Sequence, residues 1–363
     1  MVFIVSFLSI FVLIVLHELG HFFFAKKFGV RVEEFAVGFP PKIFGKQWGE
    51  TLVSLNLLPL GAFVRLTGEE KAVGDPRSYS QKPYWQRALI IGGGVAMFWL
   101  VSIAILTILG STSGIPMAVP DDFSQAGASP SIQITAIAPG SPAEDAGLKP
   151  GDTVRIVRDP ATNHEETIQS VSQLQAFIQD SKGKEVVLKV AHGKEEREVS
   201  VTPLASPPEG RGPLGVILAR TAFVTFPWYE APLKAVLLSA QLSYTIVQQL
   251  FLTLSSFFAE HNLPAGVQFV GPIGIFGMLS NSFELGIPYF FYLVSMISLY
   301  LAVFNALPIP AVDGGKLLFL GIEALRKKPL PEKLETRLTA IFFGTLLLIL
   351  ILVTIGDIKR LFI

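Results

Sequence analysis

Apolar stretches of membrane-spanning length set the first constraint on this chain of 363 residues. A helix needs about 20 consecutive apolar residues to cross the hydrocarbon core of a bilayer. The chain is 50% hydrophobic and only 16% charged, whereas an ordinary soluble domain carries about 25% charged residues. We therefore expect a polytopic α-helical membrane protein with about four transmembrane helices. They lie in the apolar runs 2–24, 88–109, 289–307 and 341–355, the last of which needs its flanking residues to complete a crossing.

Features that the sequence lacks exclude a signal peptide, cysteine chemistry and an electrostatic site for nucleic acid. The first apolar run has no basic segment before it and no small-residue cleavage site, so we expect it to be retained rather than removed as a signal peptide. The chain has no cysteine, which excludes disulfides, thiolate zinc sites and cysteine nucleophiles. Its net charge is zero, so it shows no electrostatic footprint for nucleic acid.

The chain changes character between the second and third apolar runs. Residues 114–226 are polar and contain Pro, Gly, Asp and Glu throughout. Alternating segments such as SIQITAI and EVVLKVA predict strands, and VSQLQAFIQD predicts a short helix. We expect an inserted α+β domain of roughly a hundred residues, a usual domain size. The predicted parts are a membrane domain at 1–110, the inserted domain at 115–206, a linker at 207–284 and a second membrane domain at 285–363.

Lysine and arginine residues gather in two loops between the apolar runs. Cytoplasmic loops carry an excess of these residues, which places both loops in the cytoplasm and places the inserted domain and both termini outside. The residues are Lys26, Lys27, Arg31, Lys42, Lys46, Arg65, Lys71, Arg77, Lys82 and Arg87 in the first loop, and Arg326, Lys327, Lys328, Lys333 and Arg337 in the second.

The first apolar run contains the motif HELGH. His17 and His21 are four residues apart and share one face of a helix, where two neutral imidazoles can bind one zinc ion. Zinc lowers the pKa of a bound water towards ~7, and the carboxylate of Glu18 can take its proton. The alternative is a pair of histidines bonded to neighbouring helices. That alternative leaves three polar groups in a lipid-facing segment at a high cost, so the motif favours a metal site.

A third protein ligand is needed to complete such a site. His164, His192 and His261 fall in the polar domain or its exit segment, where we expect surface residues. The remaining candidate is Asp313 in NALPIPAVDGGKLLF, at the C-terminal end of its own apolar helix. Two prolines break the helix before it, and two glycines after it permit an unusual turn. An ordinary loop turn is the alternative, but a lone acid at membrane depth is a functional hypothesis by default.

The pair of motifs, HELGH early and NALPIPAVDGG late, resembles the site-2 proteases, which are intramembrane zinc metalloproteases. The similarity is closest to the bacterial subfamily that includes the regulator of sigma-E protease, and it covers nearly the whole chain. By residue, the resemblance implies Zn2+ ligands at His17, His21 and Asp313 and a general base at Glu18. It also implies that Asn305, at the start of the second motif, helps to hold substrate.

The chain departs from the family pattern at two places. Family members often carry Gly-Pro-x-x-Asn in the second span, whereas this chain has GGGVAMF, with Met97 at the position of the asparagine. A loop that often reads GFGPKL reads GFPPKIF here, which stiffens it at Pro40.

The inserted domain contains IAPGSPAEDAGLKPGDTVRIV at 137–157, which resembles a PDZ domain with a short helix at 142–146. PDZ domains bind peptides by adding a strand to the edge of a sheet. A steric spacer without a ligand is the alternative. Close relatives can carry two such domains, and this chain has room for one.

Residues 231–262 are long and apolar enough to span, but polar side chains recur through the middle. The first helix runs from the outside towards the cytoplasm, and HELGH lies near its cytoplasmic end. Asp313 lies at the C-terminal end of its own helix. Asp313 can therefore meet HELGH only if both helices run in the same direction. The inserted domain is expected outside. The helix at 289–307 then runs from the outside towards the cytoplasm only if residues 231–262 do not cross the membrane. We therefore expect an amphipathic helix at the outer interface.

Residues 51–66, TLVSLNLLPLGAFVRL, alternate apolar and polar side chains and predict a membrane-associated β-hairpin with a turn at 59–61. A transmembrane helix has its backbone groups already paired, so it must unwind before it is cut, and an edge strand can accept the freed groups. We expect Ser54 and Asn56 on this strand to contact substrate. A hairpin without substrate contacts is the alternative.

The sequence thus predicts a multi-pass zinc metalloprotease of the inner (cytoplasmic) membrane that acts within the lipid bilayer. The resemblance implies regulated proteolysis of single-pass transmembrane proteins, with anti-sigma factors and signal-peptide remnants as candidate substrates. One alternative is a PDZ-bearing scaffold with a vestigial metal site, against which the complete ligand set argues. The other is a transporter with a His–Asp proton relay, but the chain lacks the repeats usual in transporters. The sequence does not define an oligomeric state.

Overall fold

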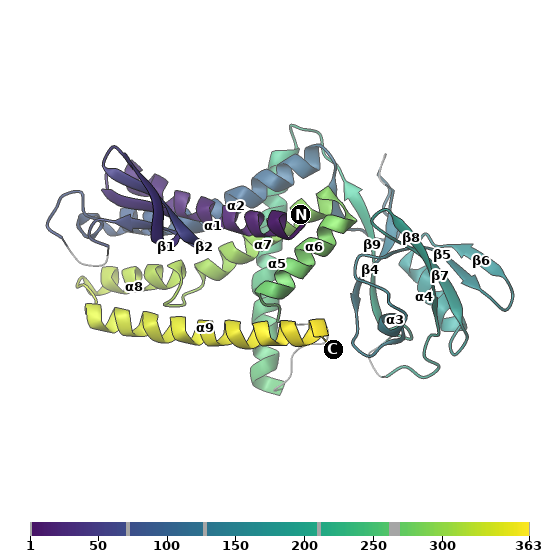
Figure 1. The fold of residues 1–363 in the computed structure, drawn as a ribbon. Helices are drawn as coiled ribbons and strands as arrows, with labels where there is room; N and C mark the ends of the chain where they lie inside the picture. The colour runs from purple at the N-terminus through teal and green to yellow at the C-terminus, as the bar shows by residue number, and fades with distance from the viewer. Residues whose placement is uncertain (1, 70–72, 126–128, 209–211, 261–268, 363) are drawn as a thin grey trace.

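The computed structural model describes residues 2–69, 73–125, 129–208, 212–260 and 269–362 (Figure 1). A helical part and a β-rich domain lie side by side, and the two ends of the chain lie on the side of the helical part that faces this domain. Within the described residues the helical part contains α1 (Val2–Lys27), η1 (Tyr79–Gln81), α2 (Tyr84–Ser111), α5 (Ala231–Glu260), α6 (Pro272–Leu285), α7 (Ile287–Ala306), α8 (Asp313–Arg326) and α9 (Glu332–Phe362).

The long apolar helices run back and forth through the helical part. α1 runs away from the β-rich domain, α2 returns towards it, α7 runs away and α9 returns (Figure 1). In the described chain five helices have the length and apolar composition to cross a membrane, namely α1, α2, α5, α7 and α9. The predicted run at 341–355 lies inside the much longer α9, so its flanking residues do extend the helix to a crossing length.

α5 differs from the other long helices in its direction. It meets the criteria of length and composition for a membrane span, yet it lies crosswise to α1 and α9 (Figure 1). Ala235 packs in a cluster with Leu106 of α2, and Ile246 packs with Leu299 and Val303 of α7. This direction is compatible with the predicted interfacial helix, which stays a prediction because the length and composition of α5 also suit a span.

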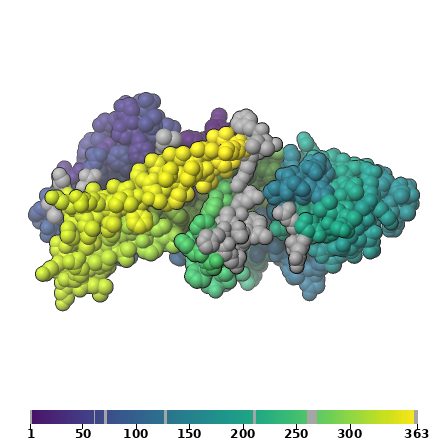
Figure 2. Space-filling model, turned by 90° about the horizontal axis from the view of Figure 1, so that it is seen from below, coloured from purple at the N-terminus to yellow at the C-terminus, as the bar shows by residue number. Residues whose placement is uncertain are grey.

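α9 is the least covered of the long helices. No residue of its most apolar window is buried, and Figure 2 shows it running uncovered along one face of the molecule. The Thr339 hydroxyl donates to the carbonyl of Pro310 near one end, and Asp357 accepts from the backbone N–H of Gly274 near the other. A helix that is apolar all round and makes few protein contacts is suited to face lipid.

β1 (Val32–Trp48) and β2 (Thr51–Leu66) form a curled sheet beside the end of α1 (Figure 1). Residues 34–37 of β1 pair on one side with 52–55 and on the other with 62–65, because β2 folds back around the predicted turn at 59–61. The predicted hairpin is therefore a curled sheet, with residues 62–66 on an outer edge. Phe44 and Trp48 near its tip are exposed, which suits contact with lipid.

The β-rich domain is built on one seven-stranded sheet. Its strand order is β3-β9-β4-β5-β7-β8, with β6 paired to β5. Ser141 and Ser170 cap the two short helices by accepting backbone N–H bonds, which fixes where each helix begins. The elements are β3 (Ile115–Ala118), β4 (Ser131–Ile137), α3 (Pro142–Asp145), β5 (Thr153–Asp159), β6 (His164–Thr167), α4 (Val171–Asp180), β7 (Val186–His192), β8 (Glu195–Val201) and β9 (Val216–Val224).

The strands predicted from SIQITAI and EVVLKVA and the helix predicted from VSQLQAFIQD are confirmed as β4, β7 and α4. The predicted end of the domain at 206 is too early. β9 lies between β3 and β4 in the sheet, so the folded unit extends to Val224. The Pro- and Gly-rich residues between β8 and β9 had the composition of a linker, which concealed the strand that follows them.

The β-rich domain is held against the helical part. The Asn281 side chain of α6 donates to the carbonyl of Pro150 over 3.1 Å. The rings of Phe223 and Tyr289 meet edge to face with centroids 5.3 Å apart, and the Gln133 amide lies 3.5 Å from the Tyr289 hydroxyl. These contacts fix the domain over the adjoining ends of α6 and α7.

Candidate metal centre

Three side chains from two distant helices converge at the centre of the helical part. His17 and His21 lie one turn apart on α1, and Asp313 is the first residue of α8. The Nε2 atoms of the two histidines are 3.2 Å apart, and each lies 3.3 Å from Oδ2 of Asp313. The three atoms thus form a nearly equilateral triangle, and all three side chains are largely buried.

The triangle has the dimensions of a tetrahedral zinc site. Zinc binds imidazole nitrogen at about 2.0–2.1 Å, so neighbouring ligand atoms of a tetrahedron lie about 3.3 Å apart. Oδ2 of Asp313 is buried and accepts no hydrogen bond within the described chain. A buried carboxylate oxygen facing two imidazole nitrogens without a donor is costly unless a cation lies between them. The donor set therefore fits one Zn2+ and leaves a fourth position open.

The orientation of each histidine is fixed by its surroundings. Nδ1 of His21 lies 2.9 Å from the carbonyl of Ile90 in α2. A carbonyl only accepts, so this nitrogen carries the proton, and Nε2 presents its lone pair to the centre, as is usual for metal-bound histidine. The ring of His17 stacks on Phe98, with centroids 4.6 Å apart. Both imidazoles are thus held for binding before a metal arrives.

Glycines of α1 and α2 make room for the centre. A Cβ added at Gly94 would overlap both imidazole rings, and one added at Gly20 would overlap the backbone of Gly93. The two helices can therefore approach closely enough for α2 to form one wall of the site. The run GGG in the second span thus matters for its lack of side chains, a role that the sequence comparison with the family pattern did not suggest.

The chain around Asp313 differs in one respect from the prediction. The helix does break after α7, but Asp313 begins the next helix instead of ending its own. The two glycines after it are helical and do not form a turn. A Cβ at Gly314 or Gly315 would overlap the backbone of residues 306–310, so both glycines allow α8 to start tightly against the end of α7.

Glu18 lines a cavity of about 180 Å³ together with the three converging residues. Among the described residues its carboxylate has no hydrogen-bond or ion-pair partner, so its oxygens are free to accept a proton. The remaining lining comes from β2, η1, α2 and α8, and consists of Phe63, Val64, Leu66, Glu69, Tyr79, Ile90, Ile91 and Lys316.

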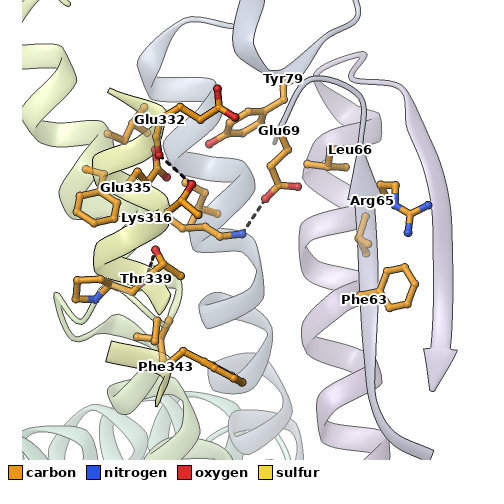
Figure 3. Close-up of a pocket in the computed structure, with 18 of the residues that line it drawn as sticks. Phe63, Arg65, Leu66, Glu69, Tyr79, Lys316, Glu332, Glu335, Thr339 and Phe343 are labelled. Atoms are coloured by element: carbon orange, nitrogen blue, oxygen red, sulfur yellow. Dashed lines mark hydrogen bonds and ion pairs between the residues drawn. The ribbon is translucent and has the colours of Figure 1, made fainter. Parts of the chain in front are cut away.

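A larger cavity of about 1000 Å³ adjoins the small one (Figure 3). The edge of β2 forms one wall, and α8 with the first turns of α9 forms the opposite wall. The two cavities have several lining residues in common and therefore lie next to each other. The shared residues are Phe63, Val64, Leu66, Glu69, Tyr79, Ile91 and Lys316.

The structure places the three predicted substrate-binding residues away from both cavities. Ser54 donates to Glu34 over 2.7 Å, and Asn56 donates to the carbonyl of Gly38 over 2.9 Å, so both hold the curled sheet together. Asn305 donates to Leu301 on its own helix. Met97 is half-buried on α2 and lines neither cavity. The part of β2 that lines the cavities is its outer edge, which the alternating pattern of 53–57 did not indicate.

The other histidines lie outside the centre. His164 is exposed on β6, as predicted. His192 is only partly exposed, with 11% of its side chain accessible, which corrects the prediction of a surface residue. Its Nδ1 lies 2.8 Å from the fully buried carboxylate of Asp152. His261 falls outside the described residues.

Lys316, Glu69 and Tyr79 line both cavities, and none was predicted to do so. Lys316 follows Asp313 by three residues on α8, so helical spacing could have placed it near the centre. Glu69 and Tyr79 come from the segment after β2, and their approach depends on long-range packing that leaves no local pattern.

Comparison of the sequence with known proteins identifies its family. Residues 5–350 match peptidase family M50. A putative zinc metalloprotease of Clostridium perfringens is 30% identical over 347 residues, covering 95% of each chain. A putative zinc metalloprotease of a Nostoc species is 33% identical over 336 residues, covering 89% of this chain and 86% of that one. The regulator of sigma-W protease of Bacillus subtilis is 27% identical over 443 aligned positions, covering 99% of each chain.

Proposed function

The chain belongs to peptidase family M50, the site-2 protease family, and we propose that it cuts transmembrane segments of single-pass membrane proteins. It is a zinc metalloprotease, which confirms the resemblance seen in its two motifs. One observation carries the proposal furthest. The triangle of His17, His21 and Asp313 lies among apolar helices and lines a small cavity, which adjoins a larger one of about 1000 Å³.

The proposed chemistry is hydrolysis of a peptide bond. His17, His21 and Asp313 would hold the zinc ion, which would supply Lewis acidity and lower the pKa of a water towards neutrality. The oxygen of the attacking water bonds to the carbonyl carbon, and Glu18 takes one proton from that water. At the same time the π electron pair of the carbonyl moves onto the carbonyl oxygen. When the C–N bond breaks, that pair returns to re-form the carbonyl, and the leaving nitrogen takes the proton that Glu18 held.

The larger cavity is the proposed path of the substrate. Its walls carry apolar side chains from β2, α8 and α9 and charged ones near the first turn of α9, which suits the end of a membrane segment. Residues 62–65 of β2 pair with β1 on one side only, so within the described sheet the other edge is open. A substrate segment that unwinds there can pair with this edge and keep its backbone groups bonded.

The proposed location is the inner membrane, with the β-rich domain and both termini outside. The support is the excess of Lys and Arg in the loops that adjoin the metal centre, together with the alternating direction of α1, α2, α7 and α9 (Figure 1). This arrangement requires that α5 lies on the outer interface and does not cross. Its crosswise orientation supports that requirement.

Cysteine labelling tests the proposed position of α5. The chain has no cysteine, so single cysteines can replace Leu233 and Phe258, which are exposed near opposite ends of the helix. An impermeant thiol reagent added from outside is expected to label both. A cysteine at Lys328, in the proposed cytoplasmic loop, is the control and should react only after the membrane is permeabilised. Labelling of either α5 cysteine only after permeabilisation would show that α5 crosses.

The β-rich domain is proposed to be PDZ-like and to control which substrates arrive. It is anchored over the ends of α6 and α7, far from the metal centre, so it takes no part in the bond chemistry. Its bulk can exclude substrates that still carry a folded ectodomain. Alternatively, it can capture a new C-terminus, since β3 pairs only with residues 221–224 of β9 and leaves the edge at 216–219 without a strand in the described sheet. We favour exclusion by bulk, because a filter needs no particular terminal sequence.

Deletion of the domain separates the two roles. The deletion has to span 115–224, because a cut at 206 would leave β9 without its sheet. With a flexible linker in its place, cleavage of a short-ectodomain substrate is expected to continue, and a substrate with an intact ectodomain should become cleavable. An unrelated folded domain of equal size at the same position is the control and should restore exclusion. An intact-ectodomain substrate that stays uncut in the deletion variant would favour capture.

Reconstitution tests the proposed function itself. Purified protein in proteoliposomes is incubated with a panel of single-pass transmembrane segments and with soluble unfolded peptides of equal length. We expect zinc-dependent cleavage of some membrane segments, loss of cleavage on chelation and recovery on adding Zn2+. Cleavage that persists in the chelated protein, or the absence of cleavage of every membrane segment in zinc-loaded protein, would contradict the proposal.

A further inference from the structure

The hydrolysis described above needs a group that stabilises negative charge on the carbonyl oxygen of the scissile bond. Such donors usually supply a large share of the rate of acyl transfer. In this structure the amide of Asn305 donates to its own helix, and its side chain lines neither cavity. The lining of the small cavity therefore has to be searched for another donor.

Lys316 is the only lysine or arginine among the described residues that line the small cavity. It lies three residues after Asp313 on α8, and residues at this spacing are neighbours on a helix face. Its side chain extends across the space between α8 and the segment that follows β2 (Figure 3). The side chain is 51% exposed and lines both cavities, which makes the ammonium accessible to a peptide lying there.

The ammonium is held in place and stays charged. Nζ of Lys316 donates to Oε1 of Glu69 over 2.8 Å. Burial alone would lower the pKa of Lys316, but the carboxylates of Glu69 and Asp313 raise it above its usual value. A lysine ammonium carries three donors, so the bond to Glu69 leaves two for another acceptor.

We propose that Lys316 is a further catalytic residue, whose ammonium donates to the carbonyl oxygen of the scissile bond as that oxygen becomes negative. The inference rests on the proposed function, because it assigns a role within the same hydrolysis. Glu69 then acts as a positioning residue that holds the ammonium at the junction of the two cavities.

Tyr79 is the competing donor in the same lining. Burial raises its pKa to about 12, so its hydroxyl stays protonated at neutral pH. The ring is buried and the guanidinium of Arg87 lies over it, 4.9 Å from its centroid. A neutral hydroxyl stabilises an oxyanion less than an ammonium does, because only the ammonium brings a full positive charge to the negative oxygen.

Four variants test the proposal in zinc-loaded protein in proteoliposomes, with kcat, KM and bound zinc measured for each. Lys316→Met is expected to lower kcat about 10²-fold, the cost of losing one such donor, with little change in KM or zinc. Lys316→Arg should recover most of the loss. Glu69→Gln breaks the same ion pair but leaves the ammonium, so it should lose far less than Lys316→Met. Lys328→Met removes a lysine beyond the end of α8 and should match the wild type.

The outcomes separate this role from a structural one. Equal losses in Glu69→Gln and Lys316→Met would show that the ion pair only braces the fold, and would overturn the proposal. Wild-type kcat in Lys316→Met would also overturn it, as would a loss found in Tyr79→Phe instead. If Lys316→Met does not accumulate, Lys316→Gln carries the same test. Failure of the proposed function is distinguished by wild-type protein, which would then show no zinc-dependent cleavage at all.

Discussion

Glu18→Gln is expected to lower the cleavage rate by about 10²–10⁴-fold, the usual contribution of a general base. The change preserves the shape of the side chain but removes its ability to take a proton from water. Glu18 contributes no atom to the triangle of His17, His21 and Asp313, so bound zinc should stay near the wild-type level. Initial rates of cleavage of a fluorescent transmembrane substrate, with zinc content measured on the same samples, check this result.

Glu195→Gln provides the matched control for Glu18→Gln. It makes the same chemical change at an exposed position on β8, far from the metal centre, and should leave the rate unchanged. Near-wild-type cleavage in Glu18→Gln would remove the general base from the mechanism, and the proton would have to be taken by another group.

Asp313→Ala is expected to lower both zinc occupancy and activity. Loss of an outer-shell partner typically costs 10–100-fold in metal affinity, so loss of a direct ligand should cost at least about 100-fold. The variant also leaves the two imidazoles without the carboxylate that faces them 3.3 Å away. Zinc content after dialysis against graded concentrations of Zn2+ measures the change.

The contrast between the two variants is the informative feature. Glu18→Gln should be inactive with zinc bound, whereas Asp313→Ala should be inactive because zinc is lost. Asp145→Ala removes an exposed carboxylate from α3 and serves as the control for the second. If Asp313→Ala retained its zinc, Asp313 would be a structural residue at the start of α8, and the third ligand would have to lie elsewhere.

The convergence of His17, His21 and Asp313 could be predicted because each residue belongs to a local sequence pattern. HELGH sets two imidazoles on one helix face through the helical period alone. Asp313 stood out because an acid in an apolar segment is costly unless it is used. What could not be foreseen is the packing around them. Gly94 makes space for both imidazoles across a helix interface, and nothing in its own segment shows which neighbour needs that space.

The substrate side of the site was predicted less well. Ser54 and Asn56 lie on the strand that the alternating pattern identified, but their polar groups bond within the curled sheet. The edge that faces the cavity is residues 62–66, because β2 folds back across β1 and pairs with it twice. Pairing of this kind depends on which strand lies next to which, and strand order has no signature in a single segment.

Helix direction was a further limit on what the sequence could establish. α5 passes every test of length and composition for a span, and only an argument about connectivity set it apart. The inserted domain shows a related limit, because β9 is separated from the rest of the sheet by a Pro- and Gly-rich segment. Both features are set by how distant parts of the chain meet, which local composition does not record.

The position of the cut within a substrate tests the central claim most directly. The metal centre lies toward the end of α1 that is remote from the β-rich domain, inside the apolar part of the molecule (Figure 1). Mass spectrometry of both products from a purified single-pass substrate should therefore place the cut within its apolar segment, nearer the cytoplasmic end. Cleavage outside the apolar segment, in the ectodomain or in the cytoplasmic tail, would contradict proteolysis within the membrane by this centre.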